Sequence, residues 1–251
     1  MRKLSIFLVL LLSALVVISA YMIYKQVTIQ QNEINKFDEL IEIVEDTSGV
    51  TEETTENPKD TESSEQKVRN LLPLLERNSD CIGWICIAGT NINYPVMHTP
   101  DSPQKYLRKD FDGQYSQSGI PFLDARCSID SGTAIIYGHN MKNGTQFSDL
   151  KKYLNADFRD SHSTIEFETK NGIRYFTVIS VKKTDIYDDI YNQLNNDGTL
   201  ILSTCYGNTK SGRLIIIAKE AIKNKEVFIF YGLRSGGCAP GRWRPPLNSY
   251  P

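Results

Sequence analysis

The sequence has few of the residues that hold metal ions or cross-link small domains. It contains three histidines and five cysteines among 251 residues, and no two cysteines have the C-x-x-C spacing of a structural zinc site. The odd number of cysteines also argues against a disulfide framework. Cys81 and Cys86 lie on opposite faces of one expected strand, so we expect packing rather than a mutual disulfide. His98 and His162 stand in polar, loop-like segments and are interpreted as solvated. We therefore expect no metal and no other cofactor.

The sequence also lacks an excess of positive charge. The formal net charge is -2, and residues 80–231 contain seventeen acidic and seventeen basic side chains. A protein that neutralises nucleic-acid phosphates needs a basic stripe. None is present, so nucleic acid is not an expected partner. The acidic excess is confined to residues 38–65, which carry eleven carboxylates and one lysine.

A long uncharged run opens the chain. After Arg2 and Lys3, residues 4–24 contain no charged side chain, and a helix of that length reaches about 30 Å, enough to cross a bilayer. The run is longer than the apolar region of a signal peptide and is followed by a poor cleavage site. We therefore expect residues 1–25 to form an uncleaved signal-anchor. Because Arg2 and Lys3 precede the span, the amino terminus is expected in the cytoplasm and the remainder outside the cell.

The next segment changes composition before the folded domain begins. Residues 26–40 could extend the helix, but residues 45–66 are mostly Thr, Glu, Ser and Asp, which cannot offset the entropy of ordering. We expect residues 26–66 to be an acidic, largely disordered stalk. We expect one folded domain, residues 67–231, large enough to be an enzyme. Its first element would be a helix that either runs continuously from Val68 or starts near Pro73. Residues 232–251 have no periodicity and are interpreted as a disordered tail or vector-derived sequence.

From Cys81 onward the sequence consists of short runs rich in β-branched and aromatic residues, separated by Gly, Asn, Asp and Pro. Eight runs have this pattern: 82–88, 92–96, 133–137, 164–167, 173–181, 200–204, 214–218 and 227–231. Helical interludes are brief, as at residues 147–154. Such a mostly β pattern predicts an antiparallel sandwich or a closed barrel. We choose the closed eight-stranded β-barrel with a few short helices.

Cys205 is the cysteine whose position suggests chemistry. It ends the apolar run 200–204 and precedes Tyr206-Gly207-Asn208, so a rigid strand would present its sulfur at the mouth of a loop. A thiol becomes a nucleophile when its neighbours favour the thiolate, and the usual partners are an imidazole and a guanidinium. A lone cysteine at a strand end is more often structural than catalytic. Its neighbours therefore decide the interpretation.

His139 and Arg213 are the candidate neighbours. His139 stands just past the end of a predicted strand, the same kind of location as Cys205. If the runs 200–204 and 214–218 pair as a hairpin, Cys205 and Arg213 lie opposite one another. A guanidinium keeps its charge, so Arg213 suits a developing oxyanion better than proton transfer. By elimination, His139 is the acid and base.

Several segments resemble the signatures of the sortase family, and more narrowly of its class B. The three main ones are Tyr137-Gly138-His139-Asn140-Met141 with Phe147-Ser148-Asp149-Leu150 behind it, Leu202-Ser203-Thr204-Cys205, and Gly212-Arg213-Leu214. Two further segments are similar to the same class: residues 78–96, with Gly83-Trp84-Ile85 and Asn93-Tyr94-Pro95-Val96, and residues 119–124. The resemblance covers about residues 74–218, in the family order His, Cys, Arg.

The resemblance implies a sortase-type barrel on the outer face of a Gram-positive cell membrane. Such enzymes are cysteine transpeptidases that cleave a sorting motif near the carboxyl terminus of a secreted protein after its Thr. They hold the protein as a thioacyl enzyme and transfer it to an amine of the peptidoglycan cross-bridge or its lipid-linked precursor. Carried over, Cys205 is the nucleophile, His139 the acid and base, and Arg213 with the Tyr206 amide stabilises the oxyanion. The motif groove would be lined by Asn93, Met97, Tyr137 and Ser203.

The chain departs from the family pattern in two places, and two other functions stay open. Ile201 stands where the signature usually begins with Thr. The connection between Lys182 and Thr199 is short where class B members usually carry a long helical insertion, which leaves the sorting motif open; residues 185–194 could supply two or three helical turns at most.

One alternative function is that of a secreted cysteine peptidase or amidase, although in the papain-like pattern the cysteine precedes the histidine. The other is a membrane-tethered binding barrel in which Cys205 is incidental.

Overall fold

The computed structural model describes residues 2–46, 69–130 and 132–221. The chain divides into two compact units, residues 1–40 and residues 41–251, and each is described by itself. The predicted strand 227–231, the tail 232–251 and residues 47–66 of the acidic stalk lie outside the described residues.

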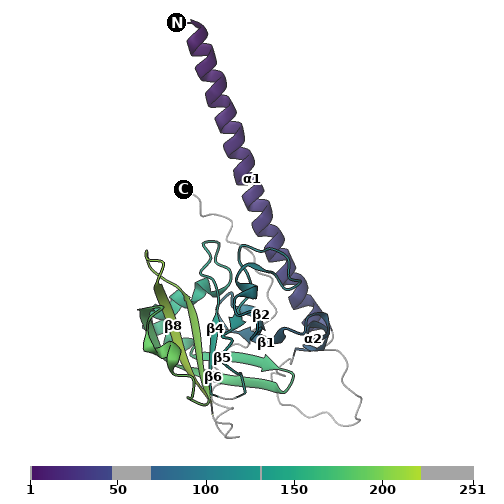
Figure 1. The fold of residues 1–251 in the computed structure, drawn as a ribbon, viewed down its shortest axis with the longest axis vertical. Helices are drawn as coiled ribbons and strands as arrows, with labels where there is room; N and C mark the ends of the chain where they lie inside the picture. The colour runs from purple at the N-terminus through teal and green to yellow at the C-terminus, as the bar shows by residue number, and fades with distance from the viewer. Residues whose placement is uncertain (1, 47–68, 131, 222–251) are drawn as a thin grey trace, which may run out of the picture. The chain divides into compact units, whose positions relative to one another are not determined.

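One long helix, α1 (Arg2–Asp46), contains the uncharged run (Figure 1). Among the described residues it is the single helix that is long and apolar enough to cross a membrane by length and composition. Large apolar side chains along residues 4–24 are exposed, as with Leu4 at 73% and Ile23 at 66%. Exposed apolar surface of this extent is unfavourable in water, and a bilayer would cover it.

The helix continues well past the uncharged run. Residues 26–46 are helical, which agrees with the expectation that residues 26–40 could extend the helix and takes it to Asp46. These residues include no Gly or Pro, and their polar side chains bond within the helix, as from Gln31 Nε2 to Asn35 Oδ1 at 2.9 Å. The carbonyl of the buried Val44 accepts a hydrogen bond from the Asn70 amide at 3.1 Å. The rest of the stalk, 47–66, lies outside the described residues.

Eight strands close into a barrel in the order β1-β2-β3-β4-β7-β8-β6-β5. The strands are β1 (Cys81–Cys86), β2 (Asn93–Met97), β3 (Phe122–Leu123), β4 (Thr133–Tyr137), β5 (Thr164–Thr169), β6 (Gly172–Asp185), β7 (Thr199–Cys205) and β8 (Gly212–Glu220). The short helices are α2 (Leu72–Arg77), η2 (Lys105–Arg108), η3 (Phe147–Leu154), α3 (Ala156–Ser161) and η4 (Asp189–Asn192). The closed, mostly β barrel confirms the expected fold class.

The barrel is mixed rather than antiparallel throughout. β2 pairs with β3 in parallel, and β4 pairs with β7 in parallel. The second of these pairs is compatible with chain connectivity because η3, α3, β5 and β6 intervene and supply the long crossover that parallel strands need. The two-residue β3 was not predicted, since a run this short shows no alternation. α2 contains Pro73 in its first turn, where proline is tolerated.

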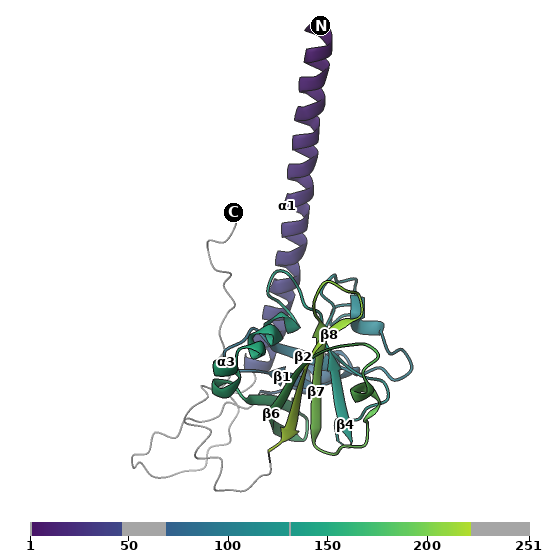
Figure 2. The ribbon, with the colours of Figure 1, turned by 90° about the vertical axis from the view of Figure 1, so that its left-hand side faces the viewer.

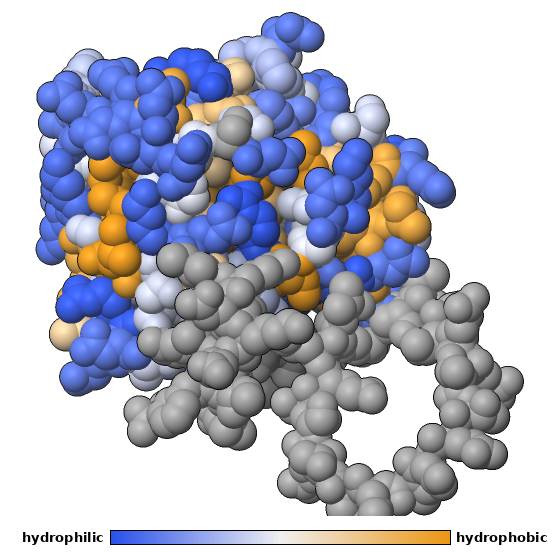
Figure 3. Space-filling view, turned by 90° about the horizontal axis from the view of Figure 1, so that it is seen from below, coloured by the Kyte–Doolittle hydropathy of each residue, from blue (hydrophilic) through white to orange (hydrophobic). Residues whose placement is uncertain are grey.

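β7 is the central strand for function. Its first six residues are buried and only the last, Cys205, is exposed. β4 and β8 flank it, as Figure 2 shows, and η3 contacts both β7 and β8. A strand covered on both faces has apolar residues in succession, which explains Leu200-Ile201-Leu202. On the face drawn in Figure 3, hydrophilic residues cover most of the surface of the described part and apolar residues appear between them.

Candidate active site

The parallel pairing of β4 and β7 brings His139 level with Cys205. Tyr137 lies opposite Ser203 in this pair, and His139 and Cys205 each follow two positions further along. The register continues beyond the strands, because Asn140 Nδ2 donates to the Cys205 carbonyl at 2.9 Å. The two strand ends are therefore tied together at the level of the thiol.

The antiparallel pairing of β7 and β8 adds Arg213 to the same level. Cys205 and Arg213 are direct partners in this hairpin, and side chains directly opposite one another have Cβ atoms about 5 Å apart. The turn between them is tight, because a Cβ at Gly212 would collide with the Tyr206 carbonyl oxygen. His139, two residues past the end of β4, thus lies in one row with Cys205 of β7 and Arg213 of β8. The hairpin that places Cys205 opposite Arg213 is the pairing expected from the sequence.

Cys205 differs from the other cysteines in accessibility. Among the described residues, Cys81 and Cys127 are buried free thiols and Cys205 is an exposed one. Burial raises the pKa of Cys81 to about 11 and also raises the pKa of Cys127, which disfavours the reactive thiolate of both. Cys86 is disulfide-bonded rather than merely packed, which corrects our expectation, and its partner is not Cys81.

His139 is held by a backbone carbonyl. Its Nε2 lies 2.9 Å from the Leu107 oxygen, and because a carbonyl only accepts, Nε2 carries the proton in the neutral ring. Nδ1 is then the nitrogen that accepts a proton. Burial lowers the pKa of His139, the Leu107 hydrogen bond opposes this shift, and the charge of Arg108 adds to it. The neutral, proton-accepting form of the ring is therefore favoured.

The oxyanion donors differ from expectation in one respect. Arg213 Nη1 donates to the Lys210 and Gly212 carbonyls at 3.0 and 2.8 Å, which holds the guanidinium at the turn beside Cys205. The Tyr206 amide, expected to share this role, donates to the Gly212 carbonyl at 3.0 Å. In this arrangement the amide is already used by the hairpin. Of the two donors expected for the oxyanion, Arg213 is the one that enters the mechanism proposed below.

Known proteins have a similar fold and a related sequence. A family model described as the sortase domain matches residues 85–221. The chain belongs to the sortase family. Sortase B of Listeria monocytogenes is 30% identical over 190 residues, which are 62% of this chain and 76% of that protein. A solved Staphylococcus aureus sortase B–substrate complex is 27% identical with a TM-score of 0.53, and the match covers 61% of this chain and 84% of that chain. A sortase B complexed with triglycine is 27% identical with a TM-score of 0.51, covering 61% and 85%.

The four residues expected to line the motif groove of this sortase are not equally accessible. Met97 and Ser203 are buried, so neither offers surface to a peptide in this arrangement. Asn93 is half-buried and accepts a hydrogen bond from Trp84 Nε1 at 2.6 Å. Tyr137 is also half-buried, and its hydroxyl donates to Asp124 at 2.8 Å. The burial of Met97 and Ser203 depends on packing that the sequence does not display, and a motif groove lined by these four residues stays a prediction.

Tyr191 is a candidate site residue that sequence reasoning missed. Its hydroxyl lies 2.8 Å from Ser203 Oγ, and its ring stacks on Tyr137 with centroids 6.3 Å apart. Cys205 and Arg213 both act electrostatically on its phenol. Tyr191 belongs to η4, a single turn where up to three helical turns were allowed, and the Asp188 side chain caps it by accepting from a backbone amide. The short connection of this sortase therefore still supplies an aromatic wall beside the row.

The other two histidines are more enclosed than expected. His98 is half-buried, and its amide donates to the Asp80 carbonyl at 2.7 Å. The His162 ring stacks on Phe158 with centroids 4.2 Å apart. Neither is a freely solvated side chain, and neither lies in the row of catalytic candidates. Both are local structural residues.

Proposed function

We propose that this sortase is a cysteine transpeptidase. It cleaves a sorting motif near the carboxyl terminus of a secreted protein after its Thr and joins the protein to an amine of peptidoglycan or its lipid-linked precursor. The observation that carries the proposal is the row of His139, Cys205 and Arg213 across β4, β7 and β8. Two solved relatives support the substrate classes: one sortase B structure contains a substrate and another contains triglycine, a peptide that begins with a primary amine.

The first half-reaction forms a thioester. His139 Nδ1 takes the proton of the Cys205 thiol, and the sulfur attacks the carbonyl carbon of the Thr. The carbonyl electron pair moves to oxygen, where the Arg213 guanidinium stabilises the negative charge. As the tetrahedral intermediate collapses, the carbon–nitrogen bond breaks and His139 returns its proton to the leaving amine. The carboxyl-terminal fragment departs and the protein stays on Cys205.

The second half-reaction reverses these roles. The acceptor amine attacks the thioester carbon, His139 takes a proton from the attacking nitrogen, and Arg213 again faces the oxyanion. Collapse breaks the carbon–sulfur bond, and the sulfur regains a proton from His139. A new amide bond joins the protein to the acceptor, and no cofactor takes part.

The proposal includes a location at the cell surface. α1 would anchor the chain in the membrane, with Arg2 and Lys3 on the cytoplasmic side according to the positive-inside rule. The catalytic unit and the acidic segment before it would then lie outside the cell. Secreted proteins and the cell-wall amine are both found on that side.

The proposed transfer is tested by adding an amine. The full chain in detergent is incubated with a panel of candidate sorting peptides, with and without triglycine, and the product masses are recorded. We expect cleavage after Thr and, as triglycine increases, a triglycine-linked product in place of the hydrolysed one. Hydrolysis alone at high amine concentration would indicate a cysteine peptidase. Absence of both cleavage and a covalent adduct across the panel would indicate a binding barrel.

Removal of the Arg213 guanidinium is expected to slow the chemical steps. Arg213→Met should lower kcat by about 10²-fold to 10³-fold with a small change in KM, because the charge acts on the transition state. Arg213→Lys should recover only part of the loss, since an ammonium lacks the planar fork. Steady-state kinetics check this, with Arg159→Met as the control on an exposed ion pair. An effect of Arg213→Met on KM alone would assign the residue to binding instead.

A further inference from the structure

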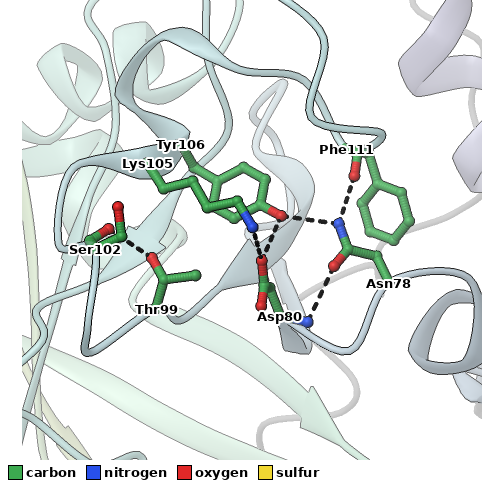
Figure 4. A network of polar contacts seen from close by, with 7 residues as sticks. All are labelled: Asn78, Asp80, Thr99, Ser102, Lys105, Tyr106 and Phe111. Atoms are coloured by element: carbon green, nitrogen blue, oxygen red, sulfur yellow. Dashed lines mark hydrogen bonds and ion pairs between the residues drawn. The ribbon is translucent and has the colours of Figure 1, made fainter.

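A polar network lies between the start of β1 and η2 (Figure 4). The Tyr106 hydroxyl donates to Asp80 Oδ2 at 2.8 Å, and Lys105 Nζ pairs with the same oxygen at 2.6 Å. Asn78 Nδ2 donates to the Tyr106 oxygen at 2.9 Å and to the Phe111 carbonyl at 2.5 Å. We call Asn78, Asp80, Lys105 and Tyr106 the Asp80 network. It fixes two successive residues of η2 to the segment that leads into the barrel.

The residue that follows this pair holds the histidine. Leu107 comes directly after Tyr106 in η2, and its carbonyl oxygen lies 2.9 Å from His139 Nε2. Tyr106 is only 1% exposed, so its ring anchors this turn in the interior. A shift of the Tyr106 side chain would move the neighbouring carbonyl. The network and the imidazole are therefore linked through the backbone of one residue, Leu107.

A second segment confines the same peptide from another direction. The Ile120 amide donates to the Tyr106 carbonyl at 3.1 Å. The backbone of Gly119 is so close that a Cβ there would lie 2.6 Å from both the Tyr106 and the Leu107 oxygens. Gln146 Nε2 in turn donates to the Gly119 carbonyl at 3.2 Å. Gly119 and Ile120 therefore hold the η2 backbone from one direction. The Asp80 network holds the side chains of Lys105 and Tyr106 from another.

We propose that the Asp80 network is a positioning element for His139: by fixing the Leu107 carbonyl, it keeps Nε2 protonated and leaves Nδ1 as the proton acceptor. The inference rests on the proposed role of His139 as acid and base, and it adds residues far from the row in the sequence. A carbonyl partner on one ring nitrogen sets both the tautomer and the orientation of an imidazole. Asp80 stays ionised because the Lys105 ammonium lowers its pKa.

The test removes one hydroxyl and keeps the ring. Tyr106→Phe deletes the bond to Asp80, and Tyr153→Phe is the matched control, because Tyr153 is also fully buried and its hydroxyl donates to the His162 carbonyl at 2.7 Å. The full chain is labelled with ¹⁵N in the histidine rings and studied by NMR in detergent. A His139→Gln sample assigns the His139 signals by their absence.

We expect the wild-type His139 signals to report the Nε2–H tautomer. In Tyr106→Phe the Nδ1–H tautomer should become populated, and the His139 titration midpoint should fall by about 0.5 unit, since the lost hydrogen bond favoured the charged ring. The transpeptidation kcat should fall about 10-fold with KM within about 2-fold. Tyr153→Phe should leave the tautomer, the midpoint and kcat as in the wild type.

Unchanged His139 tautomer and midpoint in Tyr106→Phe would overturn the inference. If that variant does not fold, Lys105→Met serves in its place, because the Lys105 side chain is 36% exposed and its replacement breaks the ion pair with Asp80 without opening a cavity. The NMR result separates the two proposals. If the wild-type chain shows no transfer but Tyr106→Phe still changes the His139 tautomer, the proposed function alone is contradicted. If the wild-type chain is active but Tyr106→Phe leaves the His139 tautomer unchanged, the positioning role alone is contradicted.

Discussion

Cys205→Ala is expected to abolish both peptide cleavage and the covalent intermediate, a loss of at least about 10⁴-fold in kcat. Cys205 is the one exposed free thiol among the described residues, and alanine has no nucleophilic atom to replace it. The hairpin should persist, because the side chain of Cys205 points to solvent while the rest of β7 supplies the buried contacts. Cleavage rates and the intact mass of the chain after incubation with a sorting peptide measure the effect.

Cys127→Ala is the matched control for that experiment. Cys127 is a free but buried thiol, so its replacement removes a sulfur of the same kind away from the row. We expect its turnover to stay within about 2-fold of the wild type and its acyl adduct to form normally. Retention of more than about 1% activity by Cys205→Ala, or an equal loss in both variants, would show that Cys205 is not the nucleophile.

His139→Gln is expected to lower kcat by about 10³-fold, the usual contribution of a positioned acid and base. Glutamine keeps an N–H group that can still donate to the Leu107 carbonyl, but it cannot exchange a proton with the thiol or the amine. Wild-type kcat/KM should fall as the pH drops through the pKa of His139, which burial holds below its ordinary value. Protonation removes the base, so this acid limb should be absent in the variant.

His162→Gln provides the comparison for His139→Gln. His162 is half-buried and stacked on Phe158, so the variant tests the loss of an enclosed imidazole outside the row. Its kcat should stay within about 2-fold of the wild type and its acid limb should be unchanged. A His139→Gln variant that keeps the acid limb would assign that limb to another group and leave His139 without its proposed role.

The row was predictable because it depends on strand register. Residues 200–202 are apolar, the run 214–218 follows a short turn, and the two segments pair as β7 and β8 with Cys205 opposite Arg213. The run 133–137 matches β4 at both ends. Where strand burial and strand pairing determine the position of a residue, the pattern of apolar residues and turns in the sequence is enough to predict that position.

Other features depend on contacts that a sequence does not display. Met97 ends β2 and Ser203 lies two residues before the end of β7, and the packing around them buries both. The resemblance to sortases assigned the Tyr206 amide to the oxyanion, and nothing in the sequence indicates that this amide donates to the Gly212 carbonyl. The Leu107 carbonyl that holds His139 is a backbone group from a distant segment. A backbone acceptor leaves no residue-type signal, so only the fold reveals it.

The most direct test of the central claim is the alkylation rate of Cys205 as a function of pH in the full chain. Exposure alone makes Cys205 react faster than the buried Cys81 and Cys127, so the informative comparison is between variants. If His139, Cys205 and Arg213 act together, His139→Gln should slow alkylation at neutral pH by about 10-fold or more and change its pH profile. Equal rates and equal profiles in the wild type and His139→Gln would contradict the account, because the thiol would then react without its neighbour.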